Sequence, residues 1–316
     1  MKISVVGCGN MGKNHARILR DMGHLDKIVE PNFQTRNSLK SMGYGRFLRS
    51  SIEETNSDAY VVATPSSTHF TIVADLLTKN KHVLVEKPAF IDPAHFLKIK
   101  ELNNEKNIIA VGHVERFNPA VRELSRKYPP KTVNRFESYR YSSRPQQVKD
   151  VGVWLDLGVH DIDIMIALMG IPKKVLAYSN IENGIDISFH ANFEFKNGAS
   201  ASINASWLSI AKRREIYVYS DHSEAKCDLL LQCVEETKTQ KLEILGDNHF
   251  APKIQEEKLI TVLSKQEPLR LEIENFIESI SDHKAPLVGL DDARIAENIL
   301  ESAYESAMSN RAIEIK

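Results

Sequence analysis

A glycine-rich turn near the N-terminus places the strongest constraint on how this chain can fold. The turn Gly7-Cys8-Gly9-Asn10-Met11-Gly12 follows the apolar run Ile3–Val6 and precedes a segment with helical spacing. A strand, a tight glycine turn and a helix in this order form the phosphate-binding start of a dinucleotide-binding domain. Gly7 permits the angles of the turn, Gly9 leaves room for a pyrophosphate, and Gly12 lets helix and strand lie close together.

An acidic residue closes the next apolar run, as the dinucleotide pattern requires. Glu30 follows Lys27–Val29, where a carboxylate accepts a hydrogen bond from a ribose 2′-hydroxyl and repels a 2′-phosphate. The sequence therefore predicts NAD as the cofactor, with NADP less favoured. The positive charge of Arg36 would weaken this preference. A purely structural glycine turn is the alternative, but it does not account for the strand, helix and acid together.

Length and composition indicate two globular domains and exclude several classes of protein. A chain of 316 residues exceeds one ordinary core, and we expect domains over residues 1–118 and 119–316. The net charge of −1 gives no electrostatic footprint for nucleic acid or an anionic membrane. No run approaches the ~20 apolar residues of a membrane span. Because Met1-Lys2 leads directly into a strand, we expect no signal peptide and a cytoplasmic location.

The cysteines indicate neither a disulfide framework nor a metal site. The chain has three cysteines, which is an odd number, and no two of them form a CxxC pair: Cys8, Cys227 and Cys233. We therefore expect reduced thiols and no bound metal.

The first part of the chain alternates short apolar runs with helical segments, which is typical of a parallel sheet covered on both faces. The expected strands are residues 3–6, 27–29, 46–48, 59–63, 82–85 and 108–112.

Beyond about residue 119, adjacent runs with alternating polarity predict a largely antiparallel sheet, and hence an α+β domain. The expected strands are residues 133–141, 174–179, 187–195, 199–207, 215–220, 225–231 and 241–244. Asn197-Gly198 predicts a hairpin turn. Helices are expected near 155–168, 270–281 and 292–308, with apolar stripes that pack against the sheet. The polar stretch 235–240 is interpreted as a solvated hairpin or loop.

Polar and glycine-containing segments follow several strands of the expected parallel sheet, where ligands bind in open α/β sheets. They include Thr64–His69, Glu86-Lys87-Pro88 and His113–Phe117. Lys87 stands between an acid and a turn-stiffening proline, so we favour a functional lysine over a free surface one. The predicted cofactor-binding residues are Gly7, Gly9, Asn10, Met11, Gly12, Glu30, Thr64, Pro65, His69, Glu86 and Lys87.

A second candidate cluster lies at Asp156–Asp163. On a helix, Asp156 and His160 are four residues apart and face the same way. The pair is either a local capping interaction or an acid–imidazole pair directed at a substrate hydroxyl. Loss of a hydride is easiest when a base takes the hydroxyl proton, and His160 or Lys87 can serve. A metal site at Asp156, His160 and Asp161 is disfavoured, because no second His or Cys lies at ligand spacing.

These segments together resemble one known family. The order GCGNMG, ATPSSTH, VEKP, GHVERFNPA and DLGVHDID is similar to that of the Gfo/Idh/MocA family of NAD(P)-dependent oxidoreductases and covers nearly the whole chain. The resemblance implies an N-terminal Rossmann domain and a C-terminal α/β domain whose open sheet face forms homodimers or homotetramers. By motif, it implies that Lys87, Asp156 and His160 are the catalytic residues.

The segments GHVERFNPAV and Val151–Asp163 most resemble the branch that contains UDP-N-acetylglucosamine 3-dehydrogenases. This implies oxidation of the C3 hydroxyl of a UDP-sugar, with Asp156 and His160 on the sugar. Arg116 and Arg144 are candidates for the diphosphate because guanidinium matches phosphate geometry, although both are also plausible ion-pair residues. Trp154 departs from many relatives and changes the expected pocket shape. The alternatives are an inositol or free-sugar dehydrogenase, or a non-catalytic NAD-binding regulator.

Overall fold

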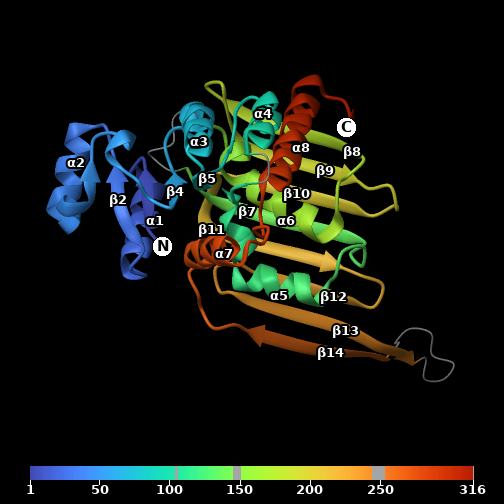
Figure 1. The fold of residues 1–316 in the computed structure, drawn as a ribbon. Coiled ribbons are helices and arrows are strands. Elements are labelled where there is room, and N and C mark those ends of the chain that lie inside the picture. The colour runs from blue at the N-terminus through green and yellow to red at the C-terminus, as the bar shows by residue number, and fades with distance from the viewer. Residues whose placement is uncertain (104–105, 145–150, 244–252, 316) are drawn as a thin grey trace. The chain divides into compact units, whose positions relative to one another are not determined.

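The computed structural model describes residues 1–103, 106–144, 151–243 and 253–315, with side chains omitted for 239–256. Contacts divide the chain into two compact units (Figure 1). The first contains Met1–Val114 and Glu267–Arg294, and the second contains Glu115–Gln266 and Ile295–Lys316. The sequence predicts a single boundary after residue 118. In the structure, the first unit also contains a segment from late in the chain, Glu267–Arg294.

The first unit is built on a six-stranded parallel sheet in the order β3-β2-β1-β4-β5-β6. The strands of this sheet are β1 (Ile3–Val6), β2 (Leu25–Val29), β3 (Leu48–Arg49), β4 (Ala59–Val62), β5 (His82–Glu86) and β6 (Ile109–Gly112). Strands β1, β4 and β6 are buried along their whole length, as expected for a sheet covered on both faces. The predicted Rossmann topology is confirmed.

Helices follow the strands in the predicted alternation. The α-helices of the first unit are α1 (Asn10–Asp21), α2 (Phe33–Leu39), α3 (His69–Thr78), α4 (Ala94–Asn103) and α7 (Pro268–Asp282). The short helical turns are η1 (Lys40–Tyr44), η2 (Gly45–Phe47), η3 (Ile52–Glu54) and η4 (Ser66–Thr68). Helix α7 buries Leu269, Ile273 and Phe276 in the same apolar core as β1 and α1. It lies far along the chain from this core, so local patterns do not predict the placement.

The second unit is built on a nine-stranded sheet in the order β14-β13-β12-β11-β7-β10-β9-β8-β15 (Figure 1). Its strands are β7 (Arg135–Ser143), β8 (Lys174–Glu182), β9 (Ile185–Glu194), β10 (Ser200–Ser206), β11 (Leu208–Tyr219), β12 (Ser223–Asp228), β13 (Cys233–Glu243), β14 (Lys253–Val262) and β15 (Ile313–Glu314). Strands β7 and β10 pair in parallel, and the other described pairs are antiparallel. The Asn197-Gly198 turn joins β9 to β10 as predicted, with Gly198 at φ +86°.

Helical segments cover one face of this sheet's core. They are η5 (Val114–Phe117), α5 (Pro119–Lys127), η6 (Trp154–Gly158), α6 (Val159–Met169) and α8 (Leu290–Ser309). Val114 and the first turn of α8 are counted with the first unit. Trp154 is fully buried and stacks on Phe189, and its Nε1 donates to the Leu300 carbonyl at 3.3 Å. The residue that departs from the family pattern is thus part of the core.

Residues 235–240, interpreted from the sequence as a solvated hairpin or loop, do not form a loop but belong to a strand that pairs antiparallel with both of its neighbours. They lie inside β13, where Glu236 is buried and accepts a hydrogen bond from Lys127 Nζ at 2.7 Å. Strand β13 pairs with β12 and β14 and is rich in charged residues, and a segment of this composition has the same sequence pattern as a solvent-exposed loop. Ile244, the last residue of the expected strand 241–244, lies outside the described residues.

Among the helices described, none combines the length and apolar character needed to cross a membrane.

Candidate cofactor and active site

The glycine turn connects β1 to α1 in the way the sequence predicts. Gly7 has a φ of +84°, and a Cβ there would lie 2.8 Å from the Ala63 carbonyl oxygen. A Cβ on Gly12 would lie 2.0 Å from the Gly7 carbonyl oxygen, so helix and turn pack too closely for any side chain. A Cβ on Gly9 would meet no atom within 4 Å. Two glycines therefore serve packing, and the third leaves the helix start open to a ligand.

Glu30 stands at the end of β2 beside this turn. It is 8% exposed, and its two carboxylate oxygens accept backbone hydrogen bonds from Cys8 at 3.0 Å and Asn32 at 2.9 Å. Arg36 donates from Nη1 to the carbonyl oxygens of Glu30 and Pro31 at 2.6 and 2.7 Å. Burial raises the pKa of the Cys8 thiol to about 12, with a further contribution from Glu30. Cys8 is therefore a neutral, structural thiol.

A cavity of about 540 Å³ joins the strand ends of the first unit. The lining residues are Gly7, Cys8, Gly9, Met11, Glu30, Pro31, Ala63, Thr64, Pro65, Glu86 and Lys87. Most of the predicted cofactor-binding residues therefore come together at one edge of the sheet. Open backbone at Gly9 and a carboxylate at the end of β2 fit the phosphates and ribose of a dinucleotide.

His69 connects two of the turns at this edge. Its Nε2 lies 2.9 Å from the Thr64 carbonyl oxygen, and its Nδ1 lies 3.1 Å from the Pro88 carbonyl oxygen. The Lys87-Pro88 peptide bond is cis. His69 is buried and does not line the cavity. We interpret it as the residue that holds the Thr64 and Lys87 turns in place.

The second predicted cluster lies on one continuous helical segment of the second unit. Asp156 belongs to η6, a single π-helical turn, and His160 lies at the start of α6. Both side chains are half-buried. A π-turn at this position is a local widening of the helix, a feature that occurs frequently at functional sites. The sequence predicts the helix but not the π-turn.

A buried ion-pair network anchors the start of α6. Arg140 on β7 donates to Glu115 at 2.9 Å and to Asp161 at 2.7 Å, and Arg214 on β11 donates to Glu115 at 2.8 Å. Burial opposes ionisation of Glu115, but Arg140 and Arg214 outweigh it and lower the pKa of this carboxyl. Because Asp161 follows His160 directly, the network fixes the backbone that carries the predicted acid–imidazole pair.

The two arginines predicted to bind a diphosphate differ in their surroundings. Arg116 donates twice to Asp163, from Nε at 2.9 Å and from Nη2 at 2.7 Å, and its side chain is 11% exposed. Arg144 is exposed, lies 4.0 Å from a Glu182 carboxylate oxygen, and packs over the Trp207 ring. Arg116 therefore has a strong structural role, whereas Arg144 lies at the surface.

Comparison with known proteins identifies the family. The description "Oxidoreductase family, NAD-binding Rossmann fold" matches residues 1–113, and "Oxidoreductase family, C-terminal alpha/beta domain" matches residues 130–315, both under Gfo/Idh/MocA. The chain belongs to the Gfo/Idh/MocA oxidoreductase family. It is thus an oxidoreductase with an NAD-binding Rossmann domain, which confirms the predicted fold, enzyme class and cofactor.

Individual relatives span almost the whole chain at low identity. UDP-N-acetylglucosamine 3-dehydrogenase of Acidithiobacillus ferrooxidans is 23% identical over 289 residues, 90% of each protein. Myo-inositol 2-dehydrogenase of Thermotoga maritima is 25% identical over 342 residues, covering 100% of this chain and 99% of the relative.

Solved structures show the same fold. A structure of the Acidithiobacillus enzyme has a TM-score of 0.85, is 23% identical, and covers 98% of this chain and 97% of its own. The WlbA dehydrogenase of Bordetella pertussis, solved with NADH and UDP-GlcNAcA, has a TM-score of 0.78 at 19% identity and covers 100% and 98%.

The sequence does not reveal several charged side chains that are directed into the interior of their own unit. Arg140 and Arg214 lie on strands whose alternating pattern gives no sign that an arginine points inward. Glu272 lies on a helix whose apolar stripe resembles ordinary packing, yet it is 2% exposed. The one sequence signal for Glu272 is that a charged residue stands directly between two apolar residues of the stripe, Leu271 and Ile273.

Replacing Gly9 with alanine is expected to weaken NAD binding by at least about tenfold, equivalent to ~1.4 kcal/mol. The added methyl group meets no protein atom, so it occupies only the space in front of the helix start. Calorimetric titration with NAD measures the effect, and thermal unfolding should be unchanged. Gly289→Ala is the control, because its Cβ also makes only ordinary contacts but lies outside the cavity. Equal NAD affinity in both variants would contradict the assignment.

Proposed function

We propose that this protein is an NAD-dependent sugar dehydrogenase that oxidises a ring hydroxyl to a ketone, at C3 of UDP-N-acetylglucosamine. The observation that carries the proposal is the likeness to UDP-N-acetylglucosamine 3-dehydrogenase, which extends over 90% of the sequence and 98% of the fold. A lysine at the cofactor cavity and an acid–imidazole pair on a helix provide the chemistry that such a reaction requires.

The catalytic residues in this proposal are Lys87, Asp156 and His160. Bound NAD supplies the acceptor for the hydride that leaves the hydroxyl-bearing carbon. The hydroxyl proton passes to a base, His160 or Lys87, as the C–O bond becomes a carbonyl. An ammonium or imidazolium beside the oxygen also stabilises the negative charge that develops on it. Asp156 orients the imidazole from one helical turn away.

The nucleotide part of the substrate needs a positively charged contact. Arg144 is the stronger of the two predicted diphosphate ligands, because its guanidinium is exposed and lies at the limit of ion-pair distance from Glu182. For Arg116 to bind a diphosphate, it would have to give up two short hydrogen bonds to a buried carboxylate. We therefore propose Arg144 as the diphosphate ligand and give Arg116 a secondary place.

The second candidate function is oxidation of an inositol or free sugar. The full-length likeness to myo-inositol 2-dehydrogenase favours it, at an identity no lower than that of the nucleotide-sugar enzyme. Such a substrate has no diphosphate, so Arg144 would not contribute to binding.

A direct assay separates these functions. The protein is incubated with NAD and either UDP-N-acetylglucosamine or myo-inositol, and absorbance of NADH is followed. We expect NAD to be reduced to NADH with the nucleotide sugar and only slightly with inositol. The Arg144→Ala variant should have a higher KM for the nucleotide sugar. Turnover of inositol alone would replace the proposal with the second candidate. NAD binding without turnover of any polyol or sugar would favour a non-catalytic regulator.

We also propose that copies associate as a homodimer or homotetramer through the nine-stranded sheet. Large apolar side chains are exposed along it, including Leu208 and Ile210 on β11. Exposed apolar side chains that gather into a contiguous patch mark interaction surfaces in soluble proteins. Light scattering coupled to size exclusion measures the mass, and a monomer at micromolar concentration would contradict this part of the proposal.

A further inference from the structure

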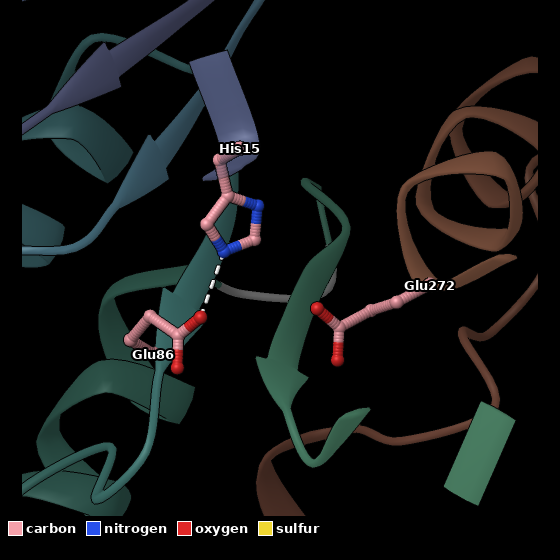
Figure 2. A group of neighbouring side chains, drawn as sticks. All are labelled: His15, Glu86 and Glu272. Carbon is pink, nitrogen blue, oxygen red and sulfur yellow. Dashed lines mark hydrogen bonds and ion pairs between the residues drawn. The ribbon is translucent and has the colours of Figure 1, made fainter. Parts of the chain in front are cut away.

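Three buried ionisable side chains meet in the first unit, and one of them, Glu86, also lines the cofactor cavity (Figure 2). His15 comes from the middle of α1, Glu86 from the end of β5, and Glu272 from α7. One donor atom from each lies within 4.8 Å of the other two. The exposed fractions of the three residues are 0%, 6% and 2%. Three segments far apart in the sequence therefore bring their polar ends to one point.

The cluster is held together on one side only. His15 Nε2 and Glu86 Oε1 are 2.7 Å apart and hydrogen-bonded. Figure 2 shows the side chain of Glu272 extending from α7 toward this pair. Among the described residues, neither carboxylate oxygen of Glu272 has a hydrogen-bond partner. A buried carboxylate without hydrogen-bond partners carries a large desolvation cost. The described side chains do not offset this cost at Glu272, so we look for a ligand that does.

Charge balance indicates that this ligand is positive. Two carboxylates and a neutral imidazole would leave two negative charges in the protein interior, which is strongly unfavourable. A proton can neutralise one charge, but a protonated Glu272 would still need an acceptor for its O–H, and no described atom accepts it. A divalent cation neutralises both carboxylates and uses their oxygens as ligands.

The spacing of the donor atoms suits one metal ion. Ligand bonds of about 2.0–2.2 Å in a tetrahedral site place any two donor atoms roughly 3.4 Å apart. His15 Nε2 and Glu86 Oε1 are 2.7 Å apart and all three donors lie within 4.8 Å of one another, so small side-chain movements bring them to one ion. Gly112 keeps the space open, because a Cβ there would lie 3.0 Å from Glu86 Oε2. One imidazole and two carboxylates are donors that suit zinc and manganese.

We propose that His15, Glu86 and Glu272 bind one divalent transition-metal ion of the zinc or manganese class. This site departs from the sequence-based expectation of no metal, which considered only the cysteines and the Asp156–Asp161 segment. A bound ion would link α1, β5 and α7 and fix the end of the strand that carries Lys87. The proposal does not depend on which sugar is oxidised, because every ligand belongs to the Rossmann unit.

The experiment is a metal titration of the full-length protein. After dialysis against a chelator, Zn²⁺ is added in competition with a chromogenic chelator, and Co²⁺ is added separately to record its visible absorption. We expect one tight equivalent in the wild-type protein. Glu272→Gln keeps the shape of the side chain and should weaken Zn²⁺ binding by about 100-fold, as loss of a ligand or its support does.

Two variants keep the result interpretable. Glu278→Gln removes an exposed carboxylate from the same helix and should bind Zn²⁺ like the wild type. Glu86→Gln tests a second ligand if Glu272→Gln does not fold, as judged by circular dichroism. Absence of a stoichiometric site in the wild-type protein would overturn the proposal and leave a shared proton in its place. Equal Zn²⁺ affinity in Glu272→Gln and the wild type would overturn it as well.

Discussion

Replacing Glu115 with glutamine is expected to lower the free energy of unfolding of the second unit by about 3 kcal/mol, because Arg140 loses one of its two carboxylate partners and Arg214 loses its partner in the buried network. Glu115 accepts hydrogen bonds from Arg140 and Arg214, and Arg140 is fully buried. The amide of glutamine can keep one acceptor oxygen but has no charge. Chemical denaturation followed by circular dichroism measures the change, with the two units treated as separate transitions where they resolve.

The control for this variant is Glu123→Gln. Glu123 pairs with Arg126, whose side chain is 70% exposed, and surface pairs of this kind contribute ~1 kcal/mol or less. A Glu115→Gln variant no less stable than the control would show that the buried network is not what stabilises this part of the sheet.

The effect of Glu115 should also depend on pH. Its pKa in the folded protein lies below the ordinary value of 4.5, since the two arginines outweigh the cost of burial. A lowered pKa means that the stabilisation is fully present above pH 4.5 and is lost as the pH falls toward the folded pKa. The difference in unfolding free energy between wild type and Glu115→Gln should therefore be largest near neutral pH and shrink on acidification. A difference that grows below pH 4.5 would contradict this.

The Rossmann half of the fold follows from the sequence because its signals are local. Gly7 has a φ of +84°, and a Cβ on Gly12 would lie 2.0 Å from the Gly7 carbonyl oxygen, so both requirements arise within the turn itself and recur at fixed offsets from a strand and a helix. The Asn197-Gly198 turn is similarly local, and the structure confirms it. Each of these features is decided by a few consecutive residues, so reading them needs no knowledge of the distant chain.

The features that the sequence does not reveal depend on distant partners. Helix α7 has an ordinary apolar stripe. The stripe does not indicate that the helix packs with β1 and α1 and not with the sheet that precedes it in the sequence. The sequence around Glu236 resembles a polar loop. Its burial depends on Lys127 and on the neighbouring strand, which are distant in the sequence. The inward direction of Arg140 becomes interpretable only when Glu115 and Asp161 lie beside it. Tertiary contacts decide these cases, and periodicity alone cannot.

Replacing Lys87 with alanine is expected to lower kcat for the sugar substrate by about 10²–10⁴-fold, the usual contribution of a positioned proton-transfer or charge-stabilising group. Lys87 lines the cofactor cavity directly after β5, at the edge of the sheet where the cofactor is expected to bind. NADH absorbance gives kcat, and calorimetry gives NAD affinity. The matched control is Lys79→Ala, which removes a surface lysine paired with Asp75. It should leave both quantities unchanged.

His160→Ala is expected to cause a loss of the same order, and the double variant decides whether the two residues act in one step. Groups that act as a unit are not additive, so the double variant should lose little more than the more damaged single variant. Losses that multiply would place Lys87 and His160 in separate steps. Full activity in both single variants would remove the catalytic assignment and leave NAD binding as the function that the Rossmann unit performs. Asp156→Asn adds a third test, because a residue that only orients His160 should have no further effect once the imidazole is gone.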